Sequence, residues 1–109
     1  MSFQIEFTKK AKEDLNEIYS YIAFTLLSPD VAKEMYYSII KGIQSLDELP
    51  LRNAVMNDEP WKSLGLRKCF IKNYTAFYLV DETNPRVRIV RIMYSGRDIQ
   101  KQLSETEER

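Results

Sequence analysis

Residues 64–80 read LGLRKCFIKNYTAFYLV, and residues 87–98 read VRIVRIMYSGRD. Both stretches are rich in β-branched and aromatic residues, and turn residues separate them at 72–73 and 81–85. They therefore predict three consecutive strands, at 66–71, 74–80 and 87–94. Asn73 is expected to adopt the positive φ of the first tight turn, because asparagine tolerates that conformation.

The first half of the chain predicts one strand and two helices. Alternating apolar residues at 3, 5 and 7 are typical of a half-buried strand. Thr8 is expected to cap a helix with an apolar stripe through Ala11, Leu15, Ile18, Ile22 and Leu26. A second helix should start at Ser28-Pro29 and end at Leu49-Pro50.

These elements predict an α+β fold in the order β-α-α-β-β-β, a small antiparallel sheet with a helical hairpin packed on one face. Residues 50–63 contain two prolines and no periodic pattern, so we expect a loop that crosses the fold. A short helix is expected at 97–103. At 109 residues, the chain is expected to form a single domain over 1–103, with a frayed tail at 104–109.

Composition limits the chemistry that the chain can perform. It contains no histidine and one cysteine, Cys69, so we expect neither a metal site nor a cofactor, and histidine acid-base catalysis is excluded. The N-terminus lacks the apolar stretch of a secretion signal, and the apolar segment at 22–27 is too short to cross a bilayer. We therefore expect a cytoplasmic protein with no membrane partner.

Charge is unevenly distributed along the chain. The net charge is zero, but residues 1–60 carry 6 basic and 10 acidic residues, whereas residues 61–101 carry 9 basic and 3 acidic residues. We expect the sheet face without helices to be an open cationic groove. The alternation slips at Ile89-Val90, so either Arg88 or Arg91 should be shielded and need an anion, such as Glu6 or a ligand.

Several motifs together resemble the RelE/ParE family of toxins from bacterial and archaeal toxin-antitoxin operons. They are Ala11-x-x-Asp14-Leu15, Leu64-Gly65-Leu66-Arg67, Asn73-Tyr74-x-x-Phe77-Tyr78 and Tyr94-x-x-Arg97-Asp98. The resemblance implies the fold predicted above. It also implies a toxin that a cognate antitoxin holds inactive and that stops growth when it is released.

RelE-like members of this family cleave messenger RNA on the ribosome. By that resemblance the endoribonuclease residues would be Arg67, Lys68, Tyr94 and Arg97: the cations would hold a phosphate, and Lys68 or Tyr94 would transfer protons. The set is incomplete, because Thr75 occupies the position of the family's third-strand arginine and the histidine is absent.

ParE-like members inhibit DNA gyrase and need no nuclease residues. The ending at 91–99 is closer to this pattern, whereas the segment from Trp61 to Lys68 is closer to RelE-like members and slightly favours messenger RNA cleavage. A third alternative is a non-toxic relic or interaction module.

Other residues have structural interpretations that compete with functional ones. The aromatic residues Tyr74, Phe77 and Tyr78 could stack on bases, but are more often core residues. Trp61 is expected to anchor the crossing loop. Asp58 and Glu59 are expected to be solvated turn residues rather than general bases.

Overall fold

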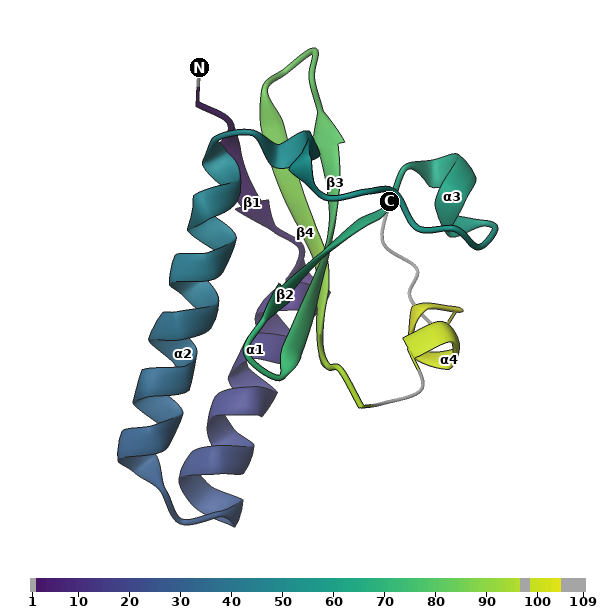
Figure 1. Ribbon diagram of the computed structural model, residues 1–109. Coiled ribbons are helices and arrows are strands. Elements are labelled where there is room, and N and C mark those ends of the chain that lie inside the picture. Colours follow the sequence, from purple (N-terminus) through teal and green to yellow (C-terminus); the bar gives the residue numbers. More distant parts are fainter. Residues whose placement is uncertain (1, 97–98, 105–109) are drawn as a thin grey trace.

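The computed structural model describes residues 2–96 and 99–104 and has the predicted order of elements (Figure 1). The strands are β1 (Gln4–Phe7), β2 (Arg67–Ile71), β3 (Tyr74–Asp81) and β4 (Arg86–Tyr94). The α-helices are α1 (Lys9–Ser20), α2 (Pro29–Gln44), α3 (Trp61–Leu64) and α4 (Ile99–Ser104). A π-helical turn, η1 (Tyr21–Thr25), follows α1, and 3₁₀ turns follow α2 at η2 (Ser45–Asp47) and η3 (Pro50–Arg52). The α+β class and the helical hairpin are confirmed, whereas α3 was not predicted.

The four strands form one mixed sheet in the order β1-β4-β3-β2. β3 pairs antiparallel with β2 and β4, but β1 pairs parallel with β4, so the prediction of a fully antiparallel sheet is wrong for this strand. Figure 1 shows the reason. α1 continues in the direction of β1, and the chain then reverses between α1 and α2, before β2, and at each of the two following hairpins. An even number of reversals brings β4 back in the direction of β1.

The predicted helix starts are confirmed. Thr8 caps α1: its Oγ1 accepts a hydrogen bond from the Ala11 N–H at 3.0 Å. Pro29 occupies the first turn of α2, where its missing N–H leaves no intrahelical bond unmade. Pro50 begins η3, after Leu49 has adopted a left-handed conformation.

Two local predictions are wrong. In η1 the Leu26 N–H donates to the Tyr21 carbonyl at 3.0 Å, so this turn contains one more residue than an α-helical turn. The apolar stripe is thereby rotated, and Leu26 is 53% exposed instead of buried. In the β2–β3 turn the positive φ, 56°, belongs to Lys72, the first of the two central residues, and not to Asn73.

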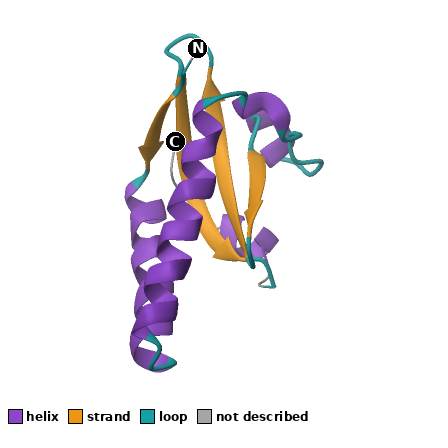
Figure 2. Ribbon diagram, turned by 60° about the vertical axis from the view of Figure 1, so that its left-hand side comes forward, coloured by secondary structure: helices purple, strands orange, loops and turns teal. Residues whose placement is uncertain are grey.

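Apolar residues pack on both faces of the sheet. The larger core lies between the sheet and the α1–α2 hairpin and includes Ile39, Ile43, Tyr78 and Ile89. The other face carries a second core of Met56, Leu66, Phe77, Val90, Met93 and Leu103, with Trp61 against it. Figures 1 and 2 show α3 and α4 on the side away from the hairpin. The expected open cationic face is therefore wrong, because the crossing segment and α4 cover it. Within the described ranges, no helix has the length and apolar character needed to cross a membrane.

Candidate functional site

Arg67 lies at the start of β2 and faces the α2 side of the sheet, like Cys69 and Ile71. Its Nη1 donates hydrogen bonds to the carbonyls of Leu51 and Asn53. The guanidinium therefore holds the segment that leaves η3. This structural role uses donors that a phosphate would otherwise occupy.

Tyr78 holds the same segment from β3. Its hydroxyl donates to the Pro50 carbonyl at 2.7 Å and accepts from Nδ2 of Asn53 at 3.0 Å. Burial raises the pKa of the Tyr78 phenol, and the hydrogen bond from Asn53 opposes that effect. Tyr78 and Arg67 are opposite each other in the β2–β3 register, so we call this pair, with Asn53, the loop latch. Sequence reasoning missed it, because the spacing of 53, 67 and 78 gives no periodic signal.

Lys68 is on the opposite face of β2 from Arg67, as strand alternation predicts. It is exposed, and its Nζ lies 5.6 Å from the centre of the Phe70 ring. Arg67 and Lys68 are therefore adjacent in sequence but do not converge on one side of the sheet.

Tyr94 ends β4 and is opposite Tyr74, with the two ring centres 5.9 Å apart. Tyr94 is 49% exposed. Arg67 is opposite Tyr78, four positions along β3 from Tyr74, which corresponds to about 13 Å along a strand. The fourth candidate, Arg97, lies outside the described residues. Among the three candidates that are described, none lies beside another in a common cluster.

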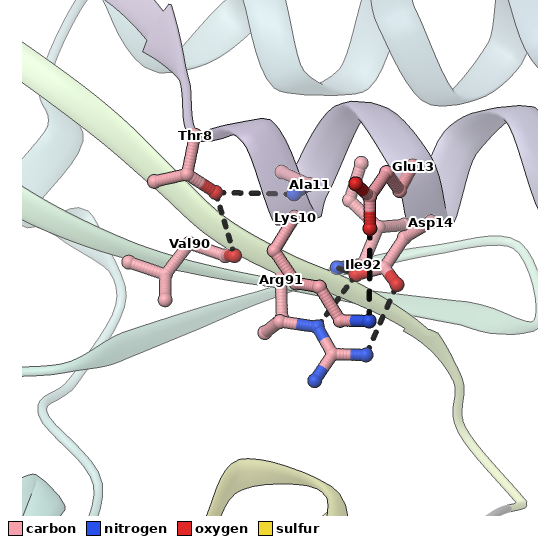
Figure 3. A network of polar contacts seen from close by, with 8 residues as sticks. All are labelled: Thr8, Lys10, Ala11, Glu13, Asp14, Val90, Arg91 and Ile92. Carbon is pink, nitrogen blue, oxygen red and sulfur yellow. Dashed lines mark hydrogen bonds and ion pairs between the residues drawn. The ribbon is translucent and has the colours of Figure 1, made fainter. Parts of the chain in front are cut away.

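The shielded arginine is Arg91, and its anion comes from α1 (Figure 3). Arg91 Nε and Nη2 donate to Oδ2 and Oδ1 of Asp14 at 2.7 and 3.0 Å. The exposed fractions of the two side chains are only 6% and 7%. Glu6, which the sequence offered as a candidate anion, instead pairs with Arg86 at 3.1 Å.

Asp14 also serves the backbone of β4. β1 ends at Phe7, opposite Ile89, so its pairing with this edge of β4 stops there. The Thr8 N–H donates to the Ile89 carbonyl. Thr8 Oγ1 donates to the Val90 carbonyl at 2.9 Å, and Asp14 Oδ2 accepts the Ile92 N–H at 3.0 Å (Figure 3). Thr8 and Asp14, at the start of α1, thus supply hydrogen-bond partners for the backbone of β4 beyond the end of β1. An aspartate within the apolar stripe of this helix was the sequence signal for such a buried role.

A groove of about 590 Å³ opens where the hairpin extends past the end of the sheet. Its charged lining residues are Asp14, Glu17 and Arg91, and its other lining residues include Tyr21, Leu26, Val31, Tyr74 and Tyr94. Since Asp14 and Arg91 pair with each other, Glu17 gives the groove a net negative charge. The groove is mainly apolar and could accommodate a protein side chain or segment.

The aromatic residues of β3, Trp61 and Glu59 have the structural roles that were expected for them. Phe77 and Tyr78 are fully buried and Tyr74 is half-buried, so the prediction that they are core residues is confirmed. Trp61 packs on the second core, as expected. Glu59 accepts the Ser63 N–H through its carboxylate. In the ranges that the structure describes, no three cysteine or carboxylate side chains form a group suited to a metal ion.

Comparison with known proteins identifies the family. Residues 5–99 match the family model of the ParE toxin of the type II toxin-antitoxin system, parDE. Comparison with curated proteins finds no significant match.

The fold also matches solved structures. A chain of the chromosomal ParDE system from P. aeruginosa superimposes with a TM-score of 0.69 at 23% identity, over 85% of this chain and 96% of that one. A mutant of E. coli toxin RelE in the free state gives a TM-score of 0.66 at 14% identity, over 97% and 95%. A chain of the RelBE2 toxin-antitoxin complex from Mycobacterium tuberculosis gives 0.63 at 19%, over 86% and 99%. With the family model covering most of the sequence, the chain belongs to the ParE toxin family of type II toxin-antitoxin systems.

Proposed function

We propose that this toxin stops growth by binding DNA gyrase, as ParE-like members do, and not by cutting messenger RNA. The observation that carries the proposal is the separation of Arg67 from Lys68 on opposite faces of β2. RNA cleavage needs a base, an acid and cations that converge on one phosphate. Arg67 instead binds backbone carbonyls of the crossing segment. A toxin that acts by occupying a protein surface needs no such cluster.

Messenger RNA cleavage, which the sequence slightly favoured, is the second candidate. Lys68 and Tyr94 support it, because both side chains are accessible to a substrate. In that mechanism Arg97 would supply the second cation. Lys68 and Tyr94 would still have to act from different regions of the sheet, which is why we place this function second.

We also propose a cognate antitoxin as the natural partner. The structures of similar fold include the RelBE2 toxin-antitoxin complex and an archaeal RelE-RelB complex from Pyrococcus horikoshii. Expression of this chain alone should halt growth, and expression of the neighbouring small gene should restore it. Normal growth with soluble, folded protein in the cell would instead support the relic or interaction module.

The two mechanisms are separated by paired assays on the purified full chain: supercoiling by DNA gyrase, and primer extension on translated message. We expect blocked supercoiling and intact message. Lys68→Ala should inhibit gyrase as strongly as the wild type, since Lys68 is exposed and does not line the groove. Codon-phased cuts that disappear in Lys68→Ala would overturn the proposal and establish the nuclease. Arg67→Ala is a poor reporter here, because it also releases the loop latch.

A further inference from the structure

The tip of the helical hairpin, which we define as residues 18–31, exposes an unusual amount of apolar surface. Tyr21 is 55% exposed, Phe24 71%, Leu26 53% and Leu27 81%. Residues 18–29 contain no charged side chain. Isolated exposed apolar residues are ordinary, but a continuous group with no charge among them is typical of an interaction surface.

The backbone of the tip is also unfavourable for the residues that it contains. Leu27 adopts a left-handed conformation, with φ of 53°, which disfavours any side chain larger than glycine or asparagine. Phe24, within η1, is exposed, and Leu26, which an α-helical turn would have kept in the stripe, is exposed as well. Stability alone would select asparagine or glycine at position 27. The leucine at position 27 therefore adds to the exposed apolar surface of the tip in a backbone conformation that disfavours it.

The shape of the tip determines how it can bind. Figures 1 and 2 both show the hairpin extending well beyond the end of the sheet, so its tip is a projection. Tyr21, Leu26 and Val31 belong to the tip and also line the groove behind it. The tip can therefore enter a cleft of a partner while the groove receives the edge of that cleft.

Charge around the tip determines the chemistry of the partner. No lysine or arginine occurs between Lys12 and Lys33, whereas Glu17 directly precedes the tip and Asp30 lies near its end. The carboxylates would repel a phosphate backbone, so nucleic acid is a poor match. The complementary surface is an apolar cleft of a protein with basic side chains at its rim.

We propose that the hairpin tip is the surface with which this toxin binds its target, by inserting Phe24 and Leu27 into an apolar cleft with a basic rim on DNA gyrase. The inference rests on the proposed function for the identity of the target. In this proposal the target binds to the acidic first 60 residues, which contain the tip, and not to the cationic second half of the chain.

The chain supplies a closely matched control for Leu27. Leu49 is also a leucine in the left-handed conformation, with φ of 52° and 76% exposure, but it lies beyond α2 and away from the tip. Asparagine suits both positions, so Leu27→Asn and Leu49→Asn each remove an apolar side chain without added strain. Leu27→Asn should weaken inhibition of supercoiling by about tenfold or more, as expected for a central interface residue, and Leu49→Asn should leave it unchanged.

A second pair tests the neighbouring aromatic residue. Phe24→Gln should weaken inhibition by a similar factor, whereas Leu64→Gln, at a residue 60% exposed on α3, should have no effect. Circular dichroism and urea unfolding would confirm that all four variants fold. Binding to the cognate antitoxin, measured on the same preparations, should be unaffected by Leu27→Asn.

The assays distinguish failure of the proposed function from failure of the proposed role of the tip. A wild type that leaves supercoiling untouched would overturn the proposed function. Inhibition by wild type that is equally strong in Leu27→Asn and Phe24→Gln would overturn only the role of the tip. A parallel loss of antitoxin binding would reassign the tip to the antitoxin, and a change in the oligomeric state of the free chain would reassign it to a second copy.

Discussion

At the scale of single residues, the buried pair of Asp14 and Arg91 is the polar contact with the largest expected effect on stability. Asp14→Ala removes the carboxylate that binds the Arg91 guanidinium and the Ile92 N–H. Breaking a buried ion pair on one side is typically destabilising by about 3–5 kcal/mol. We expect a loss of that size in the free energy of unfolding, measured with urea.

The matched control replaces both partners. In Asp14→Leu/Arg91→Met, neither member of this pair remains as a buried charge, so much of the lost stability should return. The Ile92 N–H still lacks its acceptor in this variant, which leaves a residual loss of about 1–3 kcal/mol. Equal stability of Asp14→Ala and the wild type would show that the pair contributes little.

Tyr78 gives a prediction that depends on pH. Tyr78→Phe removes the hydroxyl that donates to Pro50 and accepts from Asn53, so it should lower the free energy of unfolding by about 0.5–1.5 kcal/mol at pH 8. Burial raises the pKa of this phenol above its unfolded value of 10.0. The stabilising contribution is thus complete below that value and declines as the pH rises through the higher folded pKa.

Urea unfolding at pH 8 and pH 11 tests this dependence. The stability difference between wild type and Tyr78→Phe should become smaller at the higher pH, because only the wild type must keep this phenol protonated in order to fold. Tyr21→Phe is the control, since Tyr21 is 55% exposed and outside the latch. A difference that grows at pH 11 would contradict the assigned cause.

At the scale of helices and strands, the sequence predicted what local chemistry determines. Thr8 and Pro29 specify helix starts through a side-chain acceptor and a fixed φ, and both predictions are confirmed. The parallel pairing of β1 was missed, because it depends on how many times the whole chain reverses. Leu26 was misassigned because one extra residue in η1 rotates everything after it, and periodicity carries no information about such a turn.

The candidate site was less predictable than the fold, for a related reason. Strand alternation is enough to place Arg67 and Lys68 on opposite sides of β2, but it does not show what each side contacts. The carbonyls of Leu51 and Asn53 reach Arg67 only through the path of the crossing segment. Arg91 likewise finds its anion 77 residues away. Long-range contacts of this kind leave no local pattern in the chain.

The contact of α2 with β2 gives the prediction at this scale. Gly42 faces Ile71, and a Cβ at position 42 would lie 2.7 Å from Ile71 Cγ1 and 2.9 Å from its Cδ1. Gly42→Ala favours the helix by about 0.8–1.0 kcal/mol, whereas overpacking costs about 1–3 kcal/mol. We expect a net loss of stability in thermal unfolding. The double variant Gly42→Ala/Ile71→Ala should be more stable than Ile71→Ala alone, because the space for the new methyl then exists.

At the scale of the whole molecule, one sheet supports two cores that differ in how they are covered. The hairpin covers one face with two long helices, and the other face is covered by the crossing segment and by α4, which has only six residues. Ile43 and Leu103 represent the two sides, and both are fully buried, at 0% and 1% exposure. A short helix on a large apolar face has few contacts to oppose its release, so α4 should open without unfolding of the hairpin.

This arrangement predicts different responses to equivalent truncations. Ile43→Ala should lower the global free energy of unfolding by about 2–5 kcal/mol, as other large-to-small core changes do. Leu103→Ala should lower it less, and should instead accelerate hydrogen exchange in α4 while α1 and α2 keep their protection. Because the sheet separates the two sites, their effects should add within about 0.5 kcal/mol in the double variant. Strong coupling, or uniform loss of protection after Leu103→Ala, would show that the two cores unfold as one unit and that α4 is part of the cooperative fold.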